Sequence, residues 1–536
     1  MVFGLVFPSN LCRMVLDMRK NKPLNIILLI IGNLFFIGAL AFGAIHFYND
    51  FRERQELEKN ISASTSPPPE EITVDFENQI AIGSPLIFGG SHIPPPEHGD
   101  VFKQMSDLGV TMMRQDLAIP YSLPRDITIE DYKTNKNNIQ DPKNWDWKTI
   151  NAVKNNIHAS KTNGMPVMAI FAYAPRWLTS DGTPNGVPKD WEVYQDIVSK
   201  LYTIYRDDID YAEIGNEPDH PSFLNVKNST STKEQAYEDF YTATYTALKK
   251  VDTAANDNKK LKIGVGVESN PRISKILESL LQKQDVVKSY PPDFISFHTY
   301  DMDYSESLKL YKGYAEKYLE KDFPIFVTEW NYEDRTEASA DYKSGEKSVT
   351  FVGNRFVDYL NNGIAGANYF NLLPLNVKNQ ILGPGIQTMG FYLWNDNKVV
   401  FLPQAKTWRL MSKGMGLGKG PSRIFRAENN MKELNTAAFV NAKNQEGIVV
   451  VSSAFDTRFV QFNFENIQSP SQWRKLLIYE VNSTHDGKEP VQQEIVYMKD
   501  NHLSKKLYLP SNSIVGIVIS SDVSLYDKLK YNFLSL

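Results

Sequence analysis

The chain has 536 residues, of which 42% are hydrophobic and 12% aromatic, so it can bury a large core and we expect a folded chain, not a disordered one. Its 58 basic and 63 acidic residues are interspersed and leave a formal net charge of -5, which gives no field that would gather nucleic acid. The single cysteine, Cys12, excludes an intrachain disulfide and a metal site built from several thiolates.

Leu24 to Phe47 form an uncharged apolar run of about 24 residues, and about 20 are enough to cross a bilayer. Basic residues precede this run, so the positive-inside rule predicts a cytoplasmic segment over residues 1–23. We therefore expect a transmembrane signal anchor over residues 24–48, which makes the membrane a partner and places the rest of the chain on the extracytoplasmic side. A cleaved signal peptide is the alternative, because Ala39-Leu40-Ala41 resembles a processing site.

Residues 49–71 are first charged and then small and polar, and they end in three consecutive prolines at 67–69. Such a composition is typical of a solvated spacer with a stiff end. We expect a linker here and a folded domain from Ile72.

Between residues 72 and 418, short apolar runs alternate eight times with amphipathic segments of helical length. Lys233 to Ala255 shows the helical pattern well, with small and apolar residues returning at spacings of three and four. This alternation predicts an α/β fold, a (β/α)₈ TIM barrel. The predicted strands are Leu86 to Gly90, Val110 to Arg114, Pro166 to Phe171, Tyr211 to Gly215, Leu261 to Val265, Phe294 to His298, Ile325 to Glu329 and Gly366 to Phe370.

After Gly414 the pattern changes to short alternating segments separated by polar turns. This is typical of antiparallel strands, and we expect a C-terminal β-sandwich over residues 419–536. A strand over Ile72 to Phe76 is a candidate to pair with that appended domain.

In a barrel of this type, active sites lie at the C-terminal ends of the strands. Two glutamates occupy such ends: Glu217 in Glu213-Ile-Gly-Asn-Glu-Pro-Asp219 and Glu329 in Ile325-Phe-Val-Thr-Glu-Trp-Asn331. Cleavage of a glycosidic bond needs one carboxylic acid to protonate the leaving oxygen and a second carboxylate to attack the anomeric carbon or to activate water. The pair therefore predicts a glycosidase.

Asn-Glu after the fourth strand and Thr-Glu-Trp after the seventh resemble clan A glycoside hydrolases, and the chain is most similar to glycoside hydrolase family 39. Further matches are Phe88-Gly-Gly90, Met113-Arg-Gln-Asp116, Ala174-Pro-Arg-Trp-Leu178 and Phe297-His-Thr-Tyr300. The resemblance spans roughly residues 72–420 and implies a retaining enzyme that cleaves β-glycosidic bonds of an oligo- or polysaccharide, with Glu217 as general acid/base and Glu329 as nucleophile.

The same resemblance implies contacts with a carbohydrate substrate. The predicted substrate-binding residues are Arg114, Trp177, Asn216, His298, Tyr300 and Trp330. Four of them have a structural alternative: Asn216 as a strand cap, His298 as a support for a glutamate, and Trp177 and Trp330 as packing. No histidine pair or acidic loop has the spacing of metal ligands, so we expect no metal and no other cofactor.

Two other functions remain open at this point. A transglycosylase would use the same two glutamates with a sugar hydroxyl in place of water, and a catalytically inactive glycan-binding membrane protein would use the same barrel. The identity of the sugar, which among relatives of this kind includes xylose, glucose and uronic sugars, and endo or exo action are not determined by these motifs.

Overall fold

The structure is a computed structural model that describes residues 70–92, 100–300, 304–332, 340–375, 389–454, 456–468, 471–498 and 500–528. The predicted cytoplasmic segment, the anchor over residues 24–48 and the linker up to residue 69 lie outside the described residues. No helix within the described part of the chain is long and apolar enough to span a bilayer.

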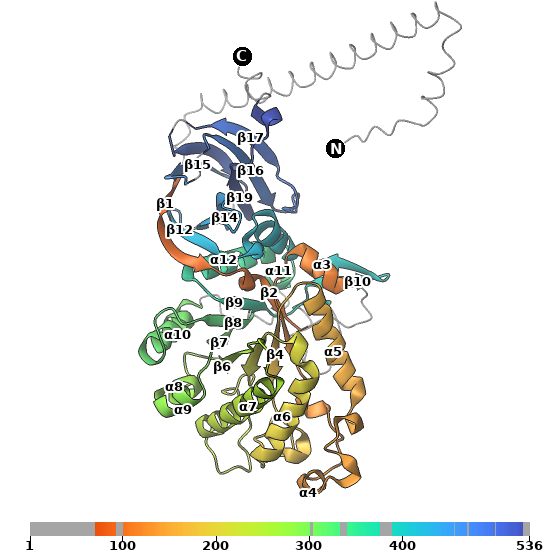
Figure 1. The fold of residues 1–536 in the computed structure, drawn as a ribbon. Coiled ribbons are helices and arrows are strands. Elements are labelled where there is room, and N and C mark those ends of the chain that lie inside the picture. Colours follow the sequence, from red (N-terminus) through yellow and green to blue (C-terminus); the bar gives the residue numbers. More distant parts are fainter. Residues whose placement is uncertain are drawn as a thin grey trace, which may run out of the picture. The chain divides into compact units, whose positions relative to one another are not determined.

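Eight parallel strands close into a barrel, which confirms the predicted (β/α)₈ architecture (Figure 1). The strands are β2 (Gly89–Ser91), β3 (Met113–Asp116), β4 (Val167–Phe171), β5 (Tyr211–Ile214), β6 (Lys262–Glu268), β7 (Phe294–Thr299), β8 (Ile325–Trp330) and β9 (Gly366–Tyr369). The first two predicted strands begin too early. Pro85–Phe88 forms a 3₁₀ turn in which the Ser84 side chain accepts a hydrogen bond from Leu86 N, and this local bond competes with strand pairing.

Helices follow the strands around the barrel, and α5, α6 and α7 are seen on its outside in Figure 1. The helices are α3 (Val101–Leu108), α4 (Ile129–Lys133), α5 (Trp147–Thr162), α6 (Trp191–Tyr205), α7 (Lys233–Ala255), α8 (Ile276–Gln282), α9 (Gln284–Ser289), α10 (Ser305–Tyr318), α11 (Ala340–Lys343), α12 (Lys347–Asn362) and α13 (Ala405–Trp408). Helix α7 has the predicted bounds because Thr232 caps its first turn through Gln235 N and Asn256 ends it in the left-handed conformation. A hairpin of β10 (Tyr392–Asn395) and β11 (Lys398–Phe401) follows the last barrel strand.

The lower end of the barrel interior is apolar. Met168, Phe294 and Phe326 come from the beginnings of β4, β7 and β8, and they form a buried cluster with Met112. The rings of Phe294 and Phe326 are 4.7 Å apart. Because this end is filled with side chains, polar chemistry inside the barrel is confined to the opposite end, where the strands finish.

A second, smaller core lies in a nine-stranded sheet. Its strands, in spatial order, are β17 (Gln492–Tyr497), β16 (Trp473–Val481), β19 (Ser513–Ser520), β14 (Glu446–Ser452), β13 (Leu434–Val440), β12 (Ser422–Asn429), β1 (Glu70–Gly83), β15 (Arg458–Glu465) and β18 (Leu503–Leu509). The predicted β domain is confirmed, but its strands form one continuous sheet, and β1 pairs in parallel with β15.

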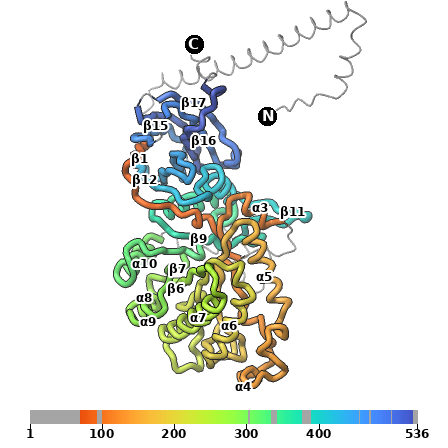
Figure 2. The backbone as a smooth tube through the Cα atoms, in the orientation of Figure 1, coloured from red at the N-terminus to blue at the C-terminus, as the bar shows by residue number. Residues whose placement is uncertain are grey.

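Strand β1 pairs with β12 along its other edge, so the predicted pairing of Ile72 to Phe76 with the C-terminal strands is confirmed. Figure 2 shows the red N-terminal strand running beside the blue C-terminal strands. Register shifts after Val74 and Gln79 bend β1, and residues from strands on both sides of it share one core, including Val74, Phe462 and Ile517. On the outer face of the sheet, Val451 and Ile514 pack closely on Gly353 of α12, which joins the sheet to the barrel.

Candidate active site

Glu217 follows β5 in a backbone conformation that residues other than glycine rarely adopt. Its φ is +50°, and Gly215 two residues earlier has φ +92°. Between them, both backbone polar groups of Asn216 bind the Tyr173 hydroxyl, which donates to Asn216 O at 2.6 Å and accepts from Asn216 N at 3.0 Å. Glu217 N donates to Val267 O on β6 at 3.0 Å. These bonds turn the Glu217 side chain back over the end of the barrel.

Glu329 lies on β8 with only 8% of its side chain exposed, and each of its carboxylate oxygens accepts a hydrogen bond. Arg114 Nη1 donates to Oε1 at 2.6 Å, and the Tyr300 hydroxyl donates to Oε2 at 2.7 Å. Arg114 is fully buried, so its charge acts on Glu329 with little screening by water. The site thus holds an ionised carboxylate in a fixed orientation.

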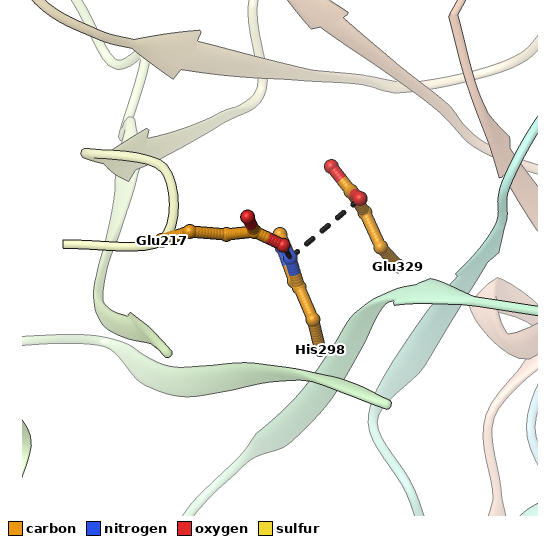
Figure 3. Close-up of side chains that lie close together, drawn as sticks. All are labelled: Glu217, His298 and Glu329. Carbon is orange, nitrogen blue, oxygen red and sulfur yellow. Dashed lines mark hydrogen bonds and ion pairs between the residues drawn. The ribbon is translucent and has the colours of Figure 1, made fainter. Parts of the chain in front are cut away.

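His298 on β7 lies between the two glutamates (Figure 3). Its Nδ1 is 3.0 Å from Glu217 Oε1 and 3.6 Å from Glu329 Oε2. One carboxylate oxygen of Glu217, one of Glu329 and a ring nitrogen of His298 all lie within 4.8 Å of one another. The two acids therefore converge on one small volume although 112 positions separate them in sequence, from 217 to 329.

Beneath these three residues lies a buried ion pair. Glu213 on β5 accepts from Arg114 Nε at 2.6 Å and from the Ser296 hydroxyl at 2.8 Å. Arg114 Nη2 donates to Asn216 Oδ1 at 3.0 Å and lies 3.3 Å from His298 Nε2. Because a guanidinium can only donate, this contact makes Nε2 of a neutral His298 the acceptor, so its Nδ1 carries the proton that faces Glu217.

Several groups act on the Glu329 carboxyl. Burial by itself would raise the pKa of Glu329, but the charges of His298, Arg114 and His92 and the bond from Tyr300 outweigh it and lower the pKa to about 2. Burial lowers the pKa of His92 to about 4, so His92 is uncharged at neutral pH, whereas Arg114 stays charged. Glu329 is consequently an anion throughout the physiological range.

The pKa values of His298 and Tyr300 are shifted as well. Burial would lower the pKa of His298, but Glu329 and Glu217 beside it outweigh that effect and raise it. Burial and the charge of Glu329 raise the pKa of the Tyr300 phenol well above its usual value, so Tyr300 remains a hydrogen-bond donor.

Four of the six predicted substrate-binding residues, Arg114, Asn216, His298 and Tyr300, contact one another or the two glutamates. Trp177 lies in the loop after β4, half-buried and stacked on Tyr132 at 5.8 Å, and its indole nitrogen is buried with no hydrogen-bond partner among the described residues.

Trp330 does not reach the site, and its predicted contact with substrate is wrong. The pairing of β8 with its neighbours shifts register between Val327 and Trp330, so the alternation of faces is interrupted there and Glu329, not Trp330, faces the barrel interior. Its ring is fully buried and stacks on Trp408 at 6.4 Å, with Phe356 and Tyr369 at its edges. Trp330 is a core residue.

The sequence motifs missed Glu213, Tyr173 and His92. A charge inside the apolar strand Tyr211–Ile214 was the available signal for Glu213. Tyr173 and His92 carry no such signal, because their positions beside Asn216 and Glu329 depend on the turns after β4 and β2.

Glu217, His298 and Glu329 are the residue types that bind metal ions, and their ligand atoms are close enough to share one. The donor set does not favour a cation, however, because the Arg114 guanidinium lies 2.6 Å from Glu329 and would repel it. The arrangement suits proton transfer and nucleophilic attack better than metal coordination.

No protein-family model matches the sequence, and no curated protein matches it. Solved structures do match the fold. A glucosidase from Croceicoccus marinus aligns with a TM-score of 0.62 and 14% identity over 85% of this chain and 100% of its own. A glycoside hydrolase family 39 enzyme from Xanthomonas axonopodis pv. citri aligns at 0.59 and 12% over 85% and 98%.

A glycoside hydrolase family 30 subfamily 8 xylanase from Clostridium acetobutylicum aligns at 0.56 and 15% identity over 84% of this chain and 100% of its own. Identities this low show a shared fold. To that extent the predicted resemblance to clan A glycoside hydrolases, family 39 among them, is confirmed.

Proposed function

We propose that the chain is a retaining glycoside hydrolase that cleaves β-glycosidic bonds of an oligo- or polysaccharide. The observation that carries the proposal is the approach of a Glu217 oxygen to within 4.8 Å of a Glu329 oxygen at the ends of the fourth and seventh barrel strands. Retaining glycosidases hold their carboxyl groups about 5–5.5 Å apart, whereas inverting enzymes need about 6.5–9.5 Å to admit a water. The short separation favours direct attack by one carboxylate.

The first step forms a covalent intermediate. Glu329 attacks the anomeric carbon while Glu217 gives its proton to the glycosidic oxygen, so the leaving sugar departs as a neutral alcohol. The lowered pKa of Glu329 keeps the attacking oxygens ionised. In the second step Glu217 removes a proton from water, whose oxygen attacks the same carbon and releases Glu329, and the original configuration is restored.

Two neighbouring side chains suit the substrate. Asn216 Oδ1 is occupied by Arg114, which leaves the Asn216 amide nitrogen to donate to the sugar's 2-hydroxyl. His298, fully buried, places Nδ1 between the two carboxyl groups and orients Glu217 for proton transfer. Trp177 is proposed to offer an apolar face to a sugar ring further from the bond that breaks.

Turnover of aryl β-glycosides and β-linked polysaccharides by the purified protein tests the function, with Glu217→Gln and Glu329→Gln as paired variants. Both changes are expected to reduce kcat by at least about 10⁴-fold, since each removes a group required in the transition state. Activity that survives Glu329→Gln would remove the proposed nucleophile.

Azide separates the two roles. Glu329→Gly with azide is expected to form an α-glycosyl azide, because the small anion attacks from the face that Glu329 vacates. Loss of the acid/base residue should instead give a β-glycosyl azide from the intact intermediate. A β-azide from Glu329→Gly would reverse the assignment.

The apolar run over residues 24–48 motivates a further part of the proposal, that the enzyme is anchored in a membrane with its barrel on the extracytoplasmic side. A polysaccharide met or exported at the cell surface is then the expected substrate. Protection of the barrel from protease in intact cells would contradict this topology. Transglycosylation uses the same two glutamates, and product analysis at high acceptor concentration distinguishes it from hydrolysis.

A further inference from the structure

The segment after Glu217 is tied to the barrel by two charged side chains that the proposed chemistry does not use. Asp219 lies two residues beyond Glu217, and its Oδ1 accepts from Ser269 N at 2.8 Å. Its Oδ2 accepts from the Ser269 hydroxyl and from Asn270 N, each at 2.9 Å. Both carboxylate oxygens of Asp219 are thus committed to the loop that follows β6.

Lys233, in the first turn of α7, holds the same segment from the other side. Its Nζ donates to the carbonyl oxygens of Pro218 at 3.0 Å, His220 at 2.6 Å and Phe223 at 2.9 Å. An ammonium group has three protons, so all of its donors are used on this one turn.

The loop that receives Asp219 is itself fixed. Glu268, the last residue of β6, is buried and accepts from the Ser274 hydroxyl, from Leu277 N at 3.0 Å and from the Tyr311 hydroxyl at 2.6 Å. These hydrogen bonds connect the loop after β6 to α8 and α10. Asp219 therefore binds a loop that is itself held in place.

Glu217 has a reason to need such support. A non-glycine residue at positive φ is strained, and such a conformation persists only when surrounding contacts hold it. Glu217 N donates to Val267 O at 3.0 Å, and Glu217 O accepts from His220 N at 2.9 Å. Asp219 and Lys233 add further contacts on the downstream side.

We propose that Asp219 and Lys233 are positioning residues that hold Glu217 where it can protonate the leaving oxygen. The inference rests on the proposed function, because it assigns these residues to the acid step of that reaction. Neither side chain touches the reacting atoms; both act through the backbone turn that carries Glu217.

Leaving-group dependence tests this role. Protonation matters for a poor leaving group such as phenol and little for 2,4-dinitrophenol, which departs as an anion. Asp219→Asn replaces one carboxylate oxygen by an NH₂ group, which cannot accept the hydrogen bonds that Ser269 and Asn270 donate. Lys233→Met removes the three hydrogen bonds from Lys233 to the backbone carbonyls of this turn. Each variant is expected to lower kcat/KM on a phenyl β-glycoside by about 10- to 100-fold, because a displacement of the Glu217 carboxyl by about 1 Å has an effect of that size. On the dinitrophenyl β-glycoside, kcat/KM is expected to fall by less than about 3-fold.

Asp293→Asn is the matched control. Asp293 also accepts a backbone hydrogen bond, from Ile263 N at 2.8 Å, but at the opposite end of the barrel, so its loss should not separate the two substrates. Ser269→Ala removes one hydroxyl from the Asp219 contact and is a milder second variant, expected to show the same selectivity at a smaller size.

Amide hydrogen exchange gives a readout that does not depend on turnover. Residues 217–223 are expected to exchange at least about 10-fold faster in Asp219→Asn than in the unaltered chain, while the Asp293→Asn variant leaves them unchanged. Equal losses on both substrates, or unchanged exchange in this segment, would overturn the inference. Glu217→Ala tests the proposed function separately from this inference. If this variant loses as much kcat/KM on the dinitrophenyl as on the phenyl β-glycoside, Glu217 is not the general acid.

Discussion

Arg114 Nη1 lies 2.6 Å from Glu329 Oε1 inside the barrel, where both side chains are buried. The same guanidinium pairs with Glu213, so one cation neutralises part of the charge of two carboxylates. Removing one partner of a buried ion pair leaves an uncompensated charge and costs about 3–5 kcal/mol. Arg114→Met is expected to lower the free energy of unfolding by about that amount, measured by urea denaturation. The double variant Arg114→Met/Glu213→Gln should recover part of the loss, and an additive loss would contradict the pairing.

Tyr300→Phe is expected to raise the pKa of Glu329, because it removes a hydrogen bond that favours the ionised form. The acid limb of the kcat/KM profile, which falls as the nucleophile is protonated, should then move to higher pH. The profile of the unaltered chain is the reference. An acid limb that stays in place would show that Tyr300 does not act on the nucleophile.

The same carboxyl links stability to pH. The pKa of Glu329 in the folded chain, about 2, lies below the ordinary glutamate value of 4.5. Its ionisation therefore stabilises the folded chain above about pH 4.5, and this contribution is lost as the pH falls toward 2. The difference in unfolding free energy between the unaltered chain and Glu329→Gln should therefore diminish over that window. A difference that is independent of pH below 4.5 would mean that the pKa of Glu329 is not lowered.

Trp330→Ala is expected to affect mainly the stability of the chain, and Trp177→Ala mainly the binding of substrate. Trp330 is enclosed by aromatic rings, so truncation leaves a cavity and should destabilise the chain by about 3–5 kcal/mol. Trp177 is half-buried, and its truncation should cost less stability and raise KM for a polysaccharide more than for an aryl monosaccharide. Thermal unfolding and steady-state kinetics on the two variants separate these outcomes.

Treatment with a chelator is expected to leave activity unchanged. The Arg114 charge beside Glu329 disfavours a cation between the two glutamates, and the proposed reaction draws its acid and its nucleophile from side chains. Loss of activity with EDTA that Mg²⁺, Ca²⁺ or Zn²⁺ restores would show that Glu217, His298 and Glu329 hold a metal ion instead.

The repeating pattern of the chain predicted the barrel strands well where strands are buried on both faces, as for β4 and β8. It failed at the first strand, where Pro85 and the Ser84 cap produce a 3₁₀ turn. Periodicity also could not show which way Trp330 points, because the face of a strand residue depends on the register of its neighbours.

The two glutamates and most of their neighbours were predictable because barrel topology brings strand ends together whatever the loops do. Tyr173 and Asp219 were not, since Tyr173 acts through hydrogen bonds to the backbone of Asn216 and Asp219 through hydrogen bonds to the loop after β6. A hydrogen bond from a side chain to a distant backbone group has no characteristic pattern of residues in the sequence. The separation of the two acids likewise required coordinates.

Strand β1 lies between β12 and β15, so the sheet formed by the C-terminal strands is divided in two until β1 is in place. During synthesis at about 5–20 residues per second, β1 emerges roughly 17 to 68 s before its first partner, β12, is made. For that time its apolar residues Ile72, Val74 and Phe76 have no sheet to pack in and are exposed to chaperones and to copies of the chain. The rate of translation through the barrel thus sets how long the nascent chain is open to misassembly.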